Sequence, residues 1–533
     1  MSRNYFIVIV LFLSLLNTNQ AQTIINSDTS YLQTGEQEFD FNITNTSFHK
    51  INLLLFIRLN ENCQFDNGEF LSLKVNNKNP QSEIKKIEFA RIYLPSFSNE
   101  RLQGNEIIYD FDLTLWQSLL YDHSKISIDY TGASPDLEIT MSFNLEEGAM
   151  PVEVLDIIPL WQSNTDGFPY GKKGVDAKYL PTRNVKLPEN TSSAFISVIV
   201  NGAGKNTKDE QLPRFYFLDI NGNEIAKRSI WREDCGLNPI YPQGDQWYDN
   251  HHNWCPGLRV NPLVHYLSAE VIENKQLNID LHFQNDLEAK SGVDSYICSS
   301  VLFALAEPKE QVNVSISEII APNIDLWHHR YNPICGSPIL LIQNNGKETV
   351  NTITINYGYN YETDNKFRWK GELGFMEQEI VYLPPLNWYF YDNDDEPETF
   401  TAHISKVNKT EKAFVGGKKT SVMELASVLP HKLIFEIQTG DYAAHIGLEI
   451  YEEDGNAVFI SEALENNKTY QFNLSLAPGC YEMIFYDDEG NGIQLSDTDA
   501  ACLIIKDQRK GLVLKEYNGD FGLEIREQFM VFH

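Results

Sequence analysis

The chain has few basic residues for its length. Its 533 residues include 42 Lys and Arg against 74 Asp and Glu, which gives a formal net charge of −32. Nucleic-acid binding needs clustered Lys and Arg to neutralise phosphates, so this deficit argues against nucleic acid as a partner. Charge of this size and sign is typical of a protein that is kept in solution by mutual repulsion.

Long apolar runs are absent after the N-terminus. Arg3 precedes an apolar run from Tyr5 to Leu16, and the small residue Ala21 lies at a suitable cleavage position. This run is too short to cross a bilayer, so residues 1–21 are predicted to be a cleaved signal peptide. No Cys follows the cut that could carry a lipid anchor. We therefore expect an exported protein without a membrane-spanning segment, either secreted, periplasmic or held at the cell surface.

Cysteine is also scarce, with seven residues in the chain. An odd count excludes a fully paired, dense disulfide scaffold, although export permits disulfides. We predict the pairs Cys235–Cys255 and Cys480–Cys502, because each lies within one predicted domain at a spacing that a loop or hairpin closes. The pairing of the other three, Cys63, Cys298 and Cys335, stays open.

Helical periodicity is nearly missing, with one weak stretch at residues 114–121. Aromatic residues make up 12% of the chain, and apolar and polar residues alternate in short segments separated by Asn, Gly, Pro and Ser. This pattern predicts an all-β protein built of sandwiches. The clearest strand-like segments are residues 50–59, 83–94, 137–143, 194–200, 214–220, 277–283 and 296–305.

The length exceeds what one hydrophobic core holds and predicts several domains. After the signal peptide we expect β-sandwiches at residues 22–150 and 151–310. An Ig-like sandwich is expected at residues 311–412 and a further β-domain at residues 413–533. No internal repeat is apparent in the sequence.

Tight turns predict two hairpins in the C-terminal half. Asn344-Asn345-Gly346 lies between the strand-like residues 339–342 and 352–357, and Asn518-Gly519-Asp520 forms a second such turn. Asn-Gly pairs favour the turns that join adjacent antiparallel strands. A third turn is expected at Asp454-Gly455-Asn456.

An unusual loop is predicted at residues 229–257, which contain three Trp and two Cys. A Cys235–Cys255 disulfide would hold this loop rigid. Rigid aromatic faces bind sugar rings well, because a sugar offers an apolar C–H face. The Trp residues could equally form only the core of the loop itself, and the residues alone leave both readings open.

Four motifs in the same region resemble the peptide-N-glycosidase F family. They are Asp166-Gly-Phe-Pro-Tyr-Gly171, Asp234-Cys-Gly-Leu-Asn-Pro239, Pro242-Gln-Gly244 and Trp254-Cys-Pro-Gly257. The resemblance covers roughly residues 23–308 and is specific over 166–257. It implies two adjacent jelly rolls with an active site between them. It also implies an amidase that cleaves the bond between N-acetylglucosamine and the Asn side chain of glycoproteins, with no metal or organic cofactor. We expect a monomer that acts on N-glycoproteins or glycans.

The resemblance also implies candidate catalytic carboxylates. Aligned backwards from Asp219-Ile-Asn-Gly222, the second-domain Glu of the family falls on Glu210 and a following Arg on Arg214. In the first domain a one-residue gap brings Asp66 to the position of the catalytic Asp. The Arg that accompanies that Asp is not matched, because Glu69 stands there with the opposite charge. The family's third acidic position falls near Asp129 to Thr131, where Asp129 is a candidate for a shifted substitute.

Predicted substrate-binding residues are Arg214, Trp247, His251 and Trp254, where His251 replaces an Arg of the family pattern. Arg groups hold an amide and its carboxylates in register, so their loss favours a second function. In that alternative the chain is a catalytically impaired relative that binds glycans or glycoproteins. A purely structural surface protein is a third alternative, but it leaves the Trp-rich loop unexplained.

Metal binding is not predicted. The pairs His251-His252 and His328-His329 would point to opposite faces of a strand, which argues against a copper site. The acidic turns at residues 392–396 and 487–492 do not match a calcium-binding loop with its terminal Glu. The two C-terminal domains lie outside the resemblance and are expected to be accessory modules.

Overall fold

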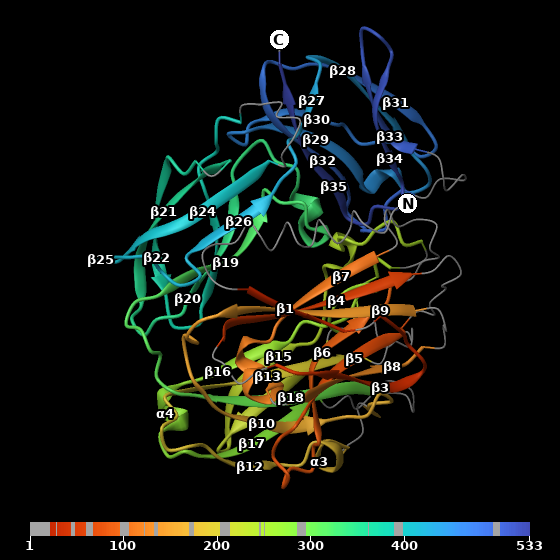
Figure 1. Ribbon diagram of the computed structural model, residues 1–533. Coiled ribbons are helices and arrows are strands. Elements are labelled where there is room, and N and C mark those ends of the chain that lie inside the picture. The colour runs from red at the N-terminus through yellow and green to blue at the C-terminus, as the bar shows by residue number, and fades with distance from the viewer. Residues whose placement is uncertain are drawn as a thin grey trace. The chain divides into compact units, whose positions relative to one another are not determined.

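The computed structural model describes most of the chain (Figure 1). The described residues are 22–27, 29–43, 48–59, 68–95, 106–121, 123–132, 137–169, 175–202, 214–244, 247–249, 251–284, 295–360, 362–388, 398–493 and 501–532. They form two compact units, one of residues 20–238 and 242–307 and one of residues 308–533 with residues 239–241. The described part is almost entirely β-structure, as the alternation predicts.

The first sandwich of the N-terminal unit has two sheets of antiparallel strands. One has the order β1-β9-β4-β7 with β2 paired to β9, and the other has the order β3-β8-β5-β6. Phe41 of β3 meets Phe143 of β9 between the sheets, with 4.7 Å between ring centroids. The strands are β1 (Gln22–Asn26), β2 (Ser30–Tyr31), β3 (Gly35–Phe41), β4 (Phe48–Leu59), β5 (Phe70–Asn76), β6 (Lys86–Tyr93), β7 (Glu106–Asp112), β8 (Ser124–Tyr130) and β9 (Leu137–Glu147).

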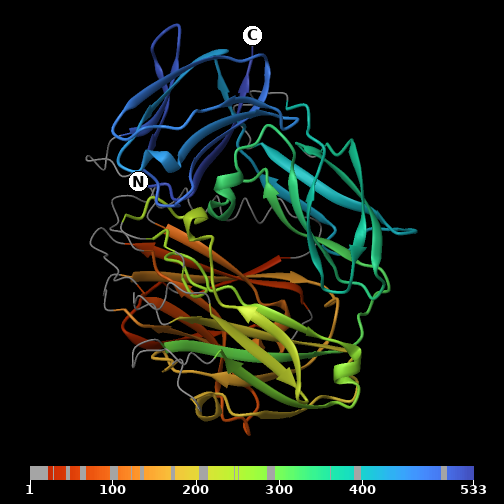
Figure 2. The ribbon, with the colours of Figure 1, turned by 180° about the vertical axis from the view of Figure 1, so that it is seen from behind.

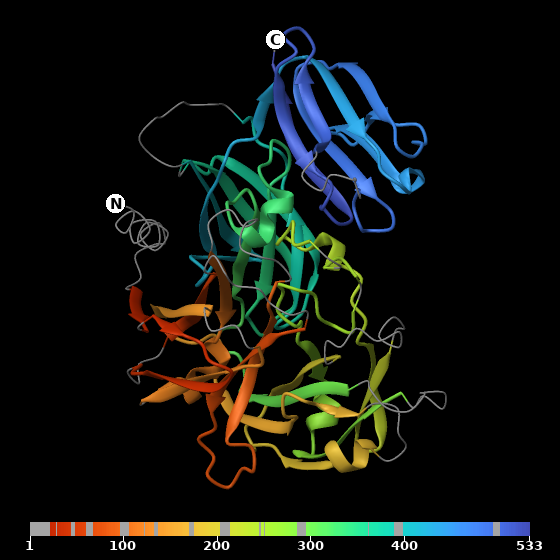
Figure 3. The same ribbon diagram turned by 90° about the vertical axis from the view of Figure 1, so that its right-hand side faces the viewer.

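The second sandwich lies beside the first in the same unit, yellow to green against red to orange (Figures 1 and 3). Its sheets have the orders β10-β18-β13-β16, with β11 paired to β18, and β12-β17-β14-β15. The strands are β10 (Val154–Gln162), β11 (Phe168–Pro169), β12 (Arg183–Lys186), β13 (Ser193–Gly202), β14 (Phe215–Ile220), β15 (Asn223–Ser229), β16 (Leu263–Leu267), β17 (Gln276–Phe283) and β18 (Ser295–Leu305).

These two sandwiches have the same topology. With β2 and β11 set aside and the strands of each sandwich numbered in chain order, both have sheets of order 1-8-3-6 and 2-7-4-5. Eight strands arranged in this way form a jelly roll. The fold therefore contains a structural repeat that no sequence similarity reveals. The connection from β4 to β5 in the first jelly roll is equivalent to the connection from β13 to β14 in the second.

The C-terminal unit contains a third and a fourth sandwich, teal and blue in Figure 2. The third has sheets β19-β20-β23 and β22-β21-β24-β25, and β26 also pairs with β24. Because β26 belongs to this sheet, the third sandwich extends to Val422, past the predicted border at residue 412. Its strands are β19 (Val314–Ala321), β20 (Ile339–Asn344), β21 (Val350–Tyr359), β22 (Asn365–Leu373), β23 (Gln378–Tyr382), β24 (Thr399–Val407), β25 (Thr410–Glu411) and β26 (Lys418–Val422).

The fourth sandwich has sheets β27-β35-β32-β29-β30 and β31-β28-β33-β34. Its core includes Phe435, Phe485 and Phe529, all of which are fully buried. The strands are β27 (Ser427–Leu429), β28 (Lys432–Gln438), β29 (Ile446–Glu452), β30 (Ala457–Ile460), β31 (Thr469–Ser475), β32 (Gly479–Asp487), β33 (Ala501–Asp507), β34 (Val513–Asn518) and β35 (Glu524–Val531).

The two predicted hairpins in the C-terminal half are wrong. β20 and β21 flank Asn344-Asn345-Gly346 but lie in different sheets, and so do β34 and β35 around Asn518-Gly519-Asp520. The side chain of Asn344 accepts a hydrogen bond from the Gly346 N–H (2.9 Å) and so stabilises a turn between the sheets. The turn at Gly455 does join two paired strands, β29 and β30.

One predicted disulfide forms and the other does not. Cys235 is bonded to Cys255 as predicted. Cys480 is bonded to Cys335 rather than to Cys502, and Cys502 is a free, buried thiol. Cys502 lies in the core of the fourth sandwich, whereas Cys480 packs at the edge of the third sandwich's core beside Cys335. The Cys335–Cys480 bond therefore joins the third and fourth sandwiches.

Helices are short and few among the described residues. The weak helical stretch expected at residues 114–121 forms η2 (Thr114–Trp116) and α2 (Gln117–Leu120). Within the described ranges no helix is long and apolar enough to cross a membrane. The remaining short helices are α3 (Val175–Tyr179), η4 (Cys235–Leu237), α4 (Ala269–Ile272), η5 (Leu326–Tyr331) and η6 (Ala443–His445).

Candidate functional site

Polar residues cross one face of the first jelly roll's β3-β8-β5-β6 sheet in two rows. Strand pairing places them directly opposite one another, so that each row contains one residue from each of the four strands. We call them the polar rows. The first row is Glu36, Asp129, Ser72 and Arg91, and the second row is Glu38, Ser127, Lys74 and Glu88.

Exposure changes along these rows. Glu36 on β3 is open to solvent, Asp129 on β8 is 21% exposed, and Arg91 on β6 is only 1% exposed. The β6 end is buried because it bonds to β13 and β18 of the second jelly roll, through Asn201, Ile297 and Ser299. Asp129 thus lies where the covered part of the sheet gives way to the open part.

The open part forms a cleft between the two jelly rolls. Its volume is about 360 Å³, and its wall on the second jelly roll consists of Gln162 and Ser163. Charges of both signs line it, since Lys74 pairs with Asp129 at 3.0 Å and Lys86 pairs with Glu36 at 3.0 Å. The full lining is Glu36, Lys74, Glu83, Ile84, Lys85, Lys86, Gln162 and Ser163.

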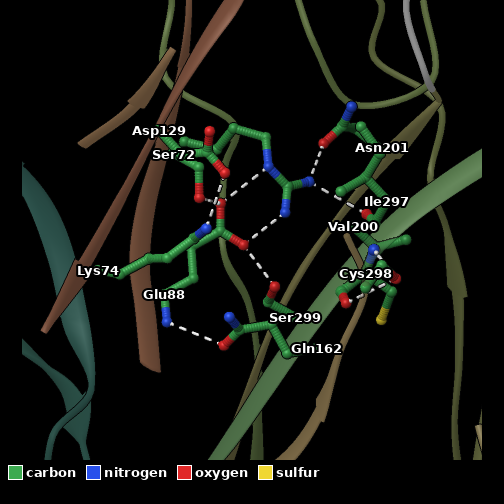
Figure 4. Close-up of polar contacts among 12 residues, drawn as sticks. Ser72, Lys74, Glu88, Asp129, Gln162, Val200, Asn201, Ile297, Cys298 and Ser299 are labelled. Atoms are coloured by element: carbon green, nitrogen blue, oxygen red, sulfur yellow. Dashed lines mark hydrogen bonds and ion pairs between the residues drawn. The ribbon is translucent and has the colours of Figure 1, made fainter. Parts of the chain in front are cut away.

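A buried ion pair lies behind this cleft. The guanidinium group of Arg91 donates to both carboxylate oxygens of Glu88, at 3.0 and 2.5 Å. Ser72 from the first jelly roll donates to the same carboxylate at 2.6 Å, and Ser299 from the second also donates to it. Figure 4 shows Glu88 between these two serines, with Lys74 and Asp129 beside them. Burial opposes ionisation of Glu88, but Arg91 and the serine hydroxyls outweigh it and hold the pKa of Glu88 below its usual value.

The same junction contains an aromatic stack. Tyr93 at the end of β6 stacks on Trp254 with 4.4 Å between ring centroids. His251 stacks on Trp254 at 4.0 Å. Trp254 is therefore covered on both faces and only 1% exposed. This geometry contradicts the expectation that Trp254 offers a free face to a sugar ring.

The other predicted substrate-binding residues are buried as well. Trp247 is fully buried, His251 is 3% exposed and Arg214 is 7% exposed. Burial and the neighbouring His252 lower the pKa of His251 to about 4. His251 is thus neutral near pH 7 and does not replace the charge of the Arg that it stands for in the family pattern. Trp254 belongs to a core at the junction, with Phe70 and Tyr93 from the first jelly roll and Ile199 and Ile297 from the second.

The predicted catalytic residues Asp66 and Glu210 lie outside the described residues. Asp66 belongs to residues 60–67 and Glu210 to residues 203–213, and described residues beside each of these segments contact the end of β6. Glu69 accepts a hydrogen bond from the backbone N–H of Leu94 (2.9 Å) through its carbonyl. Gly202, the last described residue before the second segment, accepts one from the Tyr93 hydroxyl (3.0 Å) through its carbonyl.

The loop closed by the Cys235–Cys255 disulfide (the disulfide loop) and the residues directly after it are joined to β6. The backbone N–H of Tyr93 donates to the Leu258 carbonyl (3.0 Å), and the N–H of Val260 donates to the Arg91 carbonyl (2.8 Å). These bonds cover the open edge of β6, which is the last strand of its sheet. The Cys235–Cys255 bond therefore constrains a loop that completes the junction between the jelly rolls.

Metal ligands do not gather in the part of the chain that the structure describes, where no group of three or more His, Cys, Asp or Glu side chains could hold an ion. In the acidic turn at residues 487–492, the Asp487 carboxylate accepts backbone N–H groups of Asn491 (2.7 Å) and Gly492 (2.9 Å). That carboxylate caps a turn. The other acidic turn, residues 392–396, lies outside the described residues.

Comparisons with known proteins bear on the second jelly roll. Residues 170–303 match the family model "Peptide-N-glycosidase F, C terminal". The resemblance predicted from the motifs is confirmed. The matched range contains Arg214 and the whole disulfide loop, and it includes the segment with Glu210.

A curated relative matches a longer stretch. It is the peptide-N(4)-(N-acetyl-β-D-glucosaminyl)asparagine amidase F of Elizabethkingia miricola, which is 26% identical over 220 residues. The match covers 39% of this chain and 61% of the relative, so the chain spans less than two thirds of the length of that protein.

Solved structures of the same group are similar to 53% of the chain. One is PNGase F, described as a glycosylasparaginase from Flavobacterium meningosepticum, with 20% identity, 96% of that chain covered and a TM-score of 0.45. Another is PNGF-II, with 15% identity, 65% of that chain covered and a TM-score of 0.41.

Two features of the junction were missed from the sequence. Lys74 was not identified as the partner of Asp129, and Glu88 with Arg91 was not identified at all. Ser72 and Lys74 are two residues apart on β5, so the sequence does indicate that their side chains lie on one face of the sheet. Glu88 and Arg91 are three residues apart, which in a regular strand indicates opposite faces.

Proposed function

We propose that the chain is an amidase of the peptide-N-glycosidase F type that releases N-glycans from glycoproteins. The match of residues 170–303 to the family model carries this proposal, because that range includes Glu210 and Arg214. The substrate is the amide between the glycan and the Asn side chain. Water attacks the carbonyl carbon of that amide and the C–N bond breaks, so that the Asn becomes Asp and the nitrogen leaves with the glycan as a glycosylamine. Glu210 and Asp66 are the proposed catalytic carboxylates.

The repeated topology supports a site shared by these two residues. Asp66 lies in the connection from β4 to β5, and Glu210 lies in the equivalent connection from β13 to β14. The described ends of both connections, Glu69 and Gly202, bond to neighbouring residues at the end of β6. On this basis we propose that the two carboxylates act on one bond from both sides.

Asp129 is a third proposed participant. It is a partly exposed carboxylate that pairs at 3.0 Å with Lys74, which lines the cleft. Such a carboxylate holds a water molecule or a substrate amide N–H, and the ammonium group polarises a carbonyl oxygen nearby. The polar lining of the cleft, with donors and acceptors from both jelly rolls, suits hydroxyl-rich sugar residues.

The setting of the reaction is part of the proposal. Two disulfides are consistent with an oxidising compartment, and we propose an exported monomer that acts on N-glycoproteins. The third and fourth sandwiches are proposed as accessory modules. Their disulfide bond makes them one linked pair rather than two independent modules.

The test is release of free glycan from a denatured N-glycoprotein by the purified full-length protein. We expect release by the wild type and at least a hundredfold loss, on the order expected for a general acid or base, in Glu210→Gln and Asp66→Asn. Asp40→Asn is the matched control, because Asp40 lies on β3 outside the polar rows with a 78% exposed side chain. A wild type that binds the glycoprotein without releasing glycan supports the alternative, a glycan-binding protein on an amidase scaffold.

A further inference from the structure

We infer that Arg91, with Glu88 and Tyr93, fixes the position of the end of β13 relative to the face of β5 and β8 that carries Asp129. This inference rests on the proposed function. None of the three side chains is open to substrate, since Arg91, Glu88 and Tyr93 are 1%, 4% and 0% exposed. They act by positioning the residues to which they are bonded.

The guanidinium group connects three strands. Its Nε and Nη2 atoms bind Glu88 on β6, while Nη1 donates to the Asn201 side chain on β13 and to the Ile297 carbonyl on β18 (3.1 Å). One planar group therefore fixes the first jelly roll to two neighbouring strands of the second. Figure 4 shows Asn201 and Ile297 on the side of the guanidinium group away from Glu88.

Tyr93 extends this contact to the last residue of β13. The Asn201 amide donates to the Tyr93 hydroxyl at 2.6 Å, and that hydroxyl donates to the Gly202 carbonyl at 3.0 Å. The backbone N–H of Gly202 donates to the His252 carbonyl at 3.0 Å. Gly202 is thus held from both sides, which fixes where the chain leaves β13.

Glu88 connects Arg91 to the candidate site. Ser72 donates to Glu88 and lies directly opposite Asp129 in the first polar row. Glu88 lies opposite Lys74, which pairs with Asp129. A shift of Glu88 would move Ser72, which is bonded to it and lies opposite Asp129. Gly202 and Asp129 are therefore linked through five side chains, namely Tyr93, Asn201, Arg91, Glu88 and Ser72.

Lysine is not an adequate replacement for Arg91. The site needs two donors toward Glu88 and one group directed at both Asn201 and Ile297, and these directions match a planar fork. A single ammonium group lacks this planar geometry. Arg91→Lys is therefore expected to behave like Arg91→Met.

The test compares two isosteric variants in the full chain. Tyr93→Phe removes the hydroxyl at Gly202 and keeps the ring on Trp254. Tyr109→Phe is the matched control, because the Tyr109 hydroxyl also crosses the junction, to the Gly257 carbonyl at 2.7 Å, but far along the chain from β13. Kinetics of glycan release are measured on a glycopeptide at a temperature where both variants are folded by circular dichroism. Arg91→Met and Arg91→Lys are measured beside them.

We expect Tyr93→Phe, Arg91→Met and Arg91→Lys to lower kcat about tenfold to a hundredfold with little change in KM, because misplacement of a catalytic group affects the reaction more than binding. Tyr109→Phe is expected to keep the wild-type kcat at a similar melting temperature to Tyr93→Phe. Equal kcat values in Tyr93→Phe and Tyr109→Phe, beside an active wild type, would overturn the inference and leave the proposed function intact. An inactive wild type would overturn the proposed function and this inference together.

Discussion

Arg91 follows Glu88 by three residues, and both side chains lie on the same face of β6. A regular strand would direct them to opposite faces. The register with β5 shifts between Leu73 and Lys74, so that Leu73 opposes Ala90 and Lys74 opposes Glu88. Phe89 is left without an opposite residue, as in a β-bulge. The bulge creates the ion pair and directs it at the second jelly roll.

The pair of Asp129 and Lys74 gives the first prediction. Asp129→Asn removes the charge of the carboxylate that pairs with Lys74 and is expected to lower glycan release about a hundredfold. The pair is partly exposed, so the free energy of unfolding should change by only about 1 kcal/mol or less. Kinetics and urea unfolding measured on the same preparation check both values. Wild-type release by Asp129→Asn would exclude this carboxylate from the reaction.

Trp254 gives a second prediction, on stability. Because both faces of its ring are covered, Trp254→Ala should leave a cavity and lower the free energy of unfolding of the N-terminal unit by about 3–5 kcal/mol. Trp231 is only partly buried, so Trp231→Ala is expected to have a smaller effect. Denaturant unfolding measures this difference. A stable Trp254→Ala variant that has lost only glycan affinity would restore the idea of a sugar platform.

The sequence could predict the strands but not what covers them. Alternation along residues 50–59 and 214–220 predicts β4 and β14, and an all-β fold follows from many such segments. Burial of Trp254 depends on Tyr93, which lies far away in the sequence and in the other jelly roll. The bulge at Phe89 depends on pairing with β5, and nothing in residues 83–94 alone signals it.

The Cys335–Cys480 bond gives a third prediction. Its partners are 145 residues apart, so in a chain-entropy model the bond stabilises the C-terminal unit by about 5 kcal/mol. Cys335→Ser is expected to lower the melting temperature of that unit strongly. Cys502→Ser is the control, because that thiol is free. Peptide mapping without reduction should recover Cys335 linked to Cys480, and recovery of Cys480 linked to Cys502 would contradict the structure.

The wrong prediction of Cys480–Cys502 and the two wrong hairpins have the same cause. Proximity in sequence favoured Cys502 as the partner of Cys480 and favoured hairpins at the two Asn-Gly turns. In a sandwich the chain often crosses from one sheet to the other, so neighbours in sequence belong to different layers. Cys335 reaches Cys480 only because the third and fourth sandwiches pack together, and no local pattern encodes that contact.

His251 gives a prediction on pH. Its pKa in the folded protein is lowered to about 4, below the usual value of 6.5, because it is buried beside His252. Between these values the unfolded chain binds the proton and the folded protein does not. Stability is therefore lost as the pH falls from about 6.5 to about 4, by an amount on the order of 3 kcal/mol. Urea unfolding across this range should show a shallower pH dependence in His251→Gln, and an unchanged dependence would show that another group is responsible.

Hydrolysis in heavy-oxygen water tests the amidase proposal most directly. A glycopeptide with one N-glycan is incubated with the wild-type protein, and the peptide is then analysed by mass spectrometry. Hydrolysis of the side-chain amide predicts a peptide in which the glycosylated Asn has become Asp with one heavy oxygen in its carboxylate. A peptide that keeps its glycan, or that keeps an Asn bearing a single sugar, would contradict the proposal.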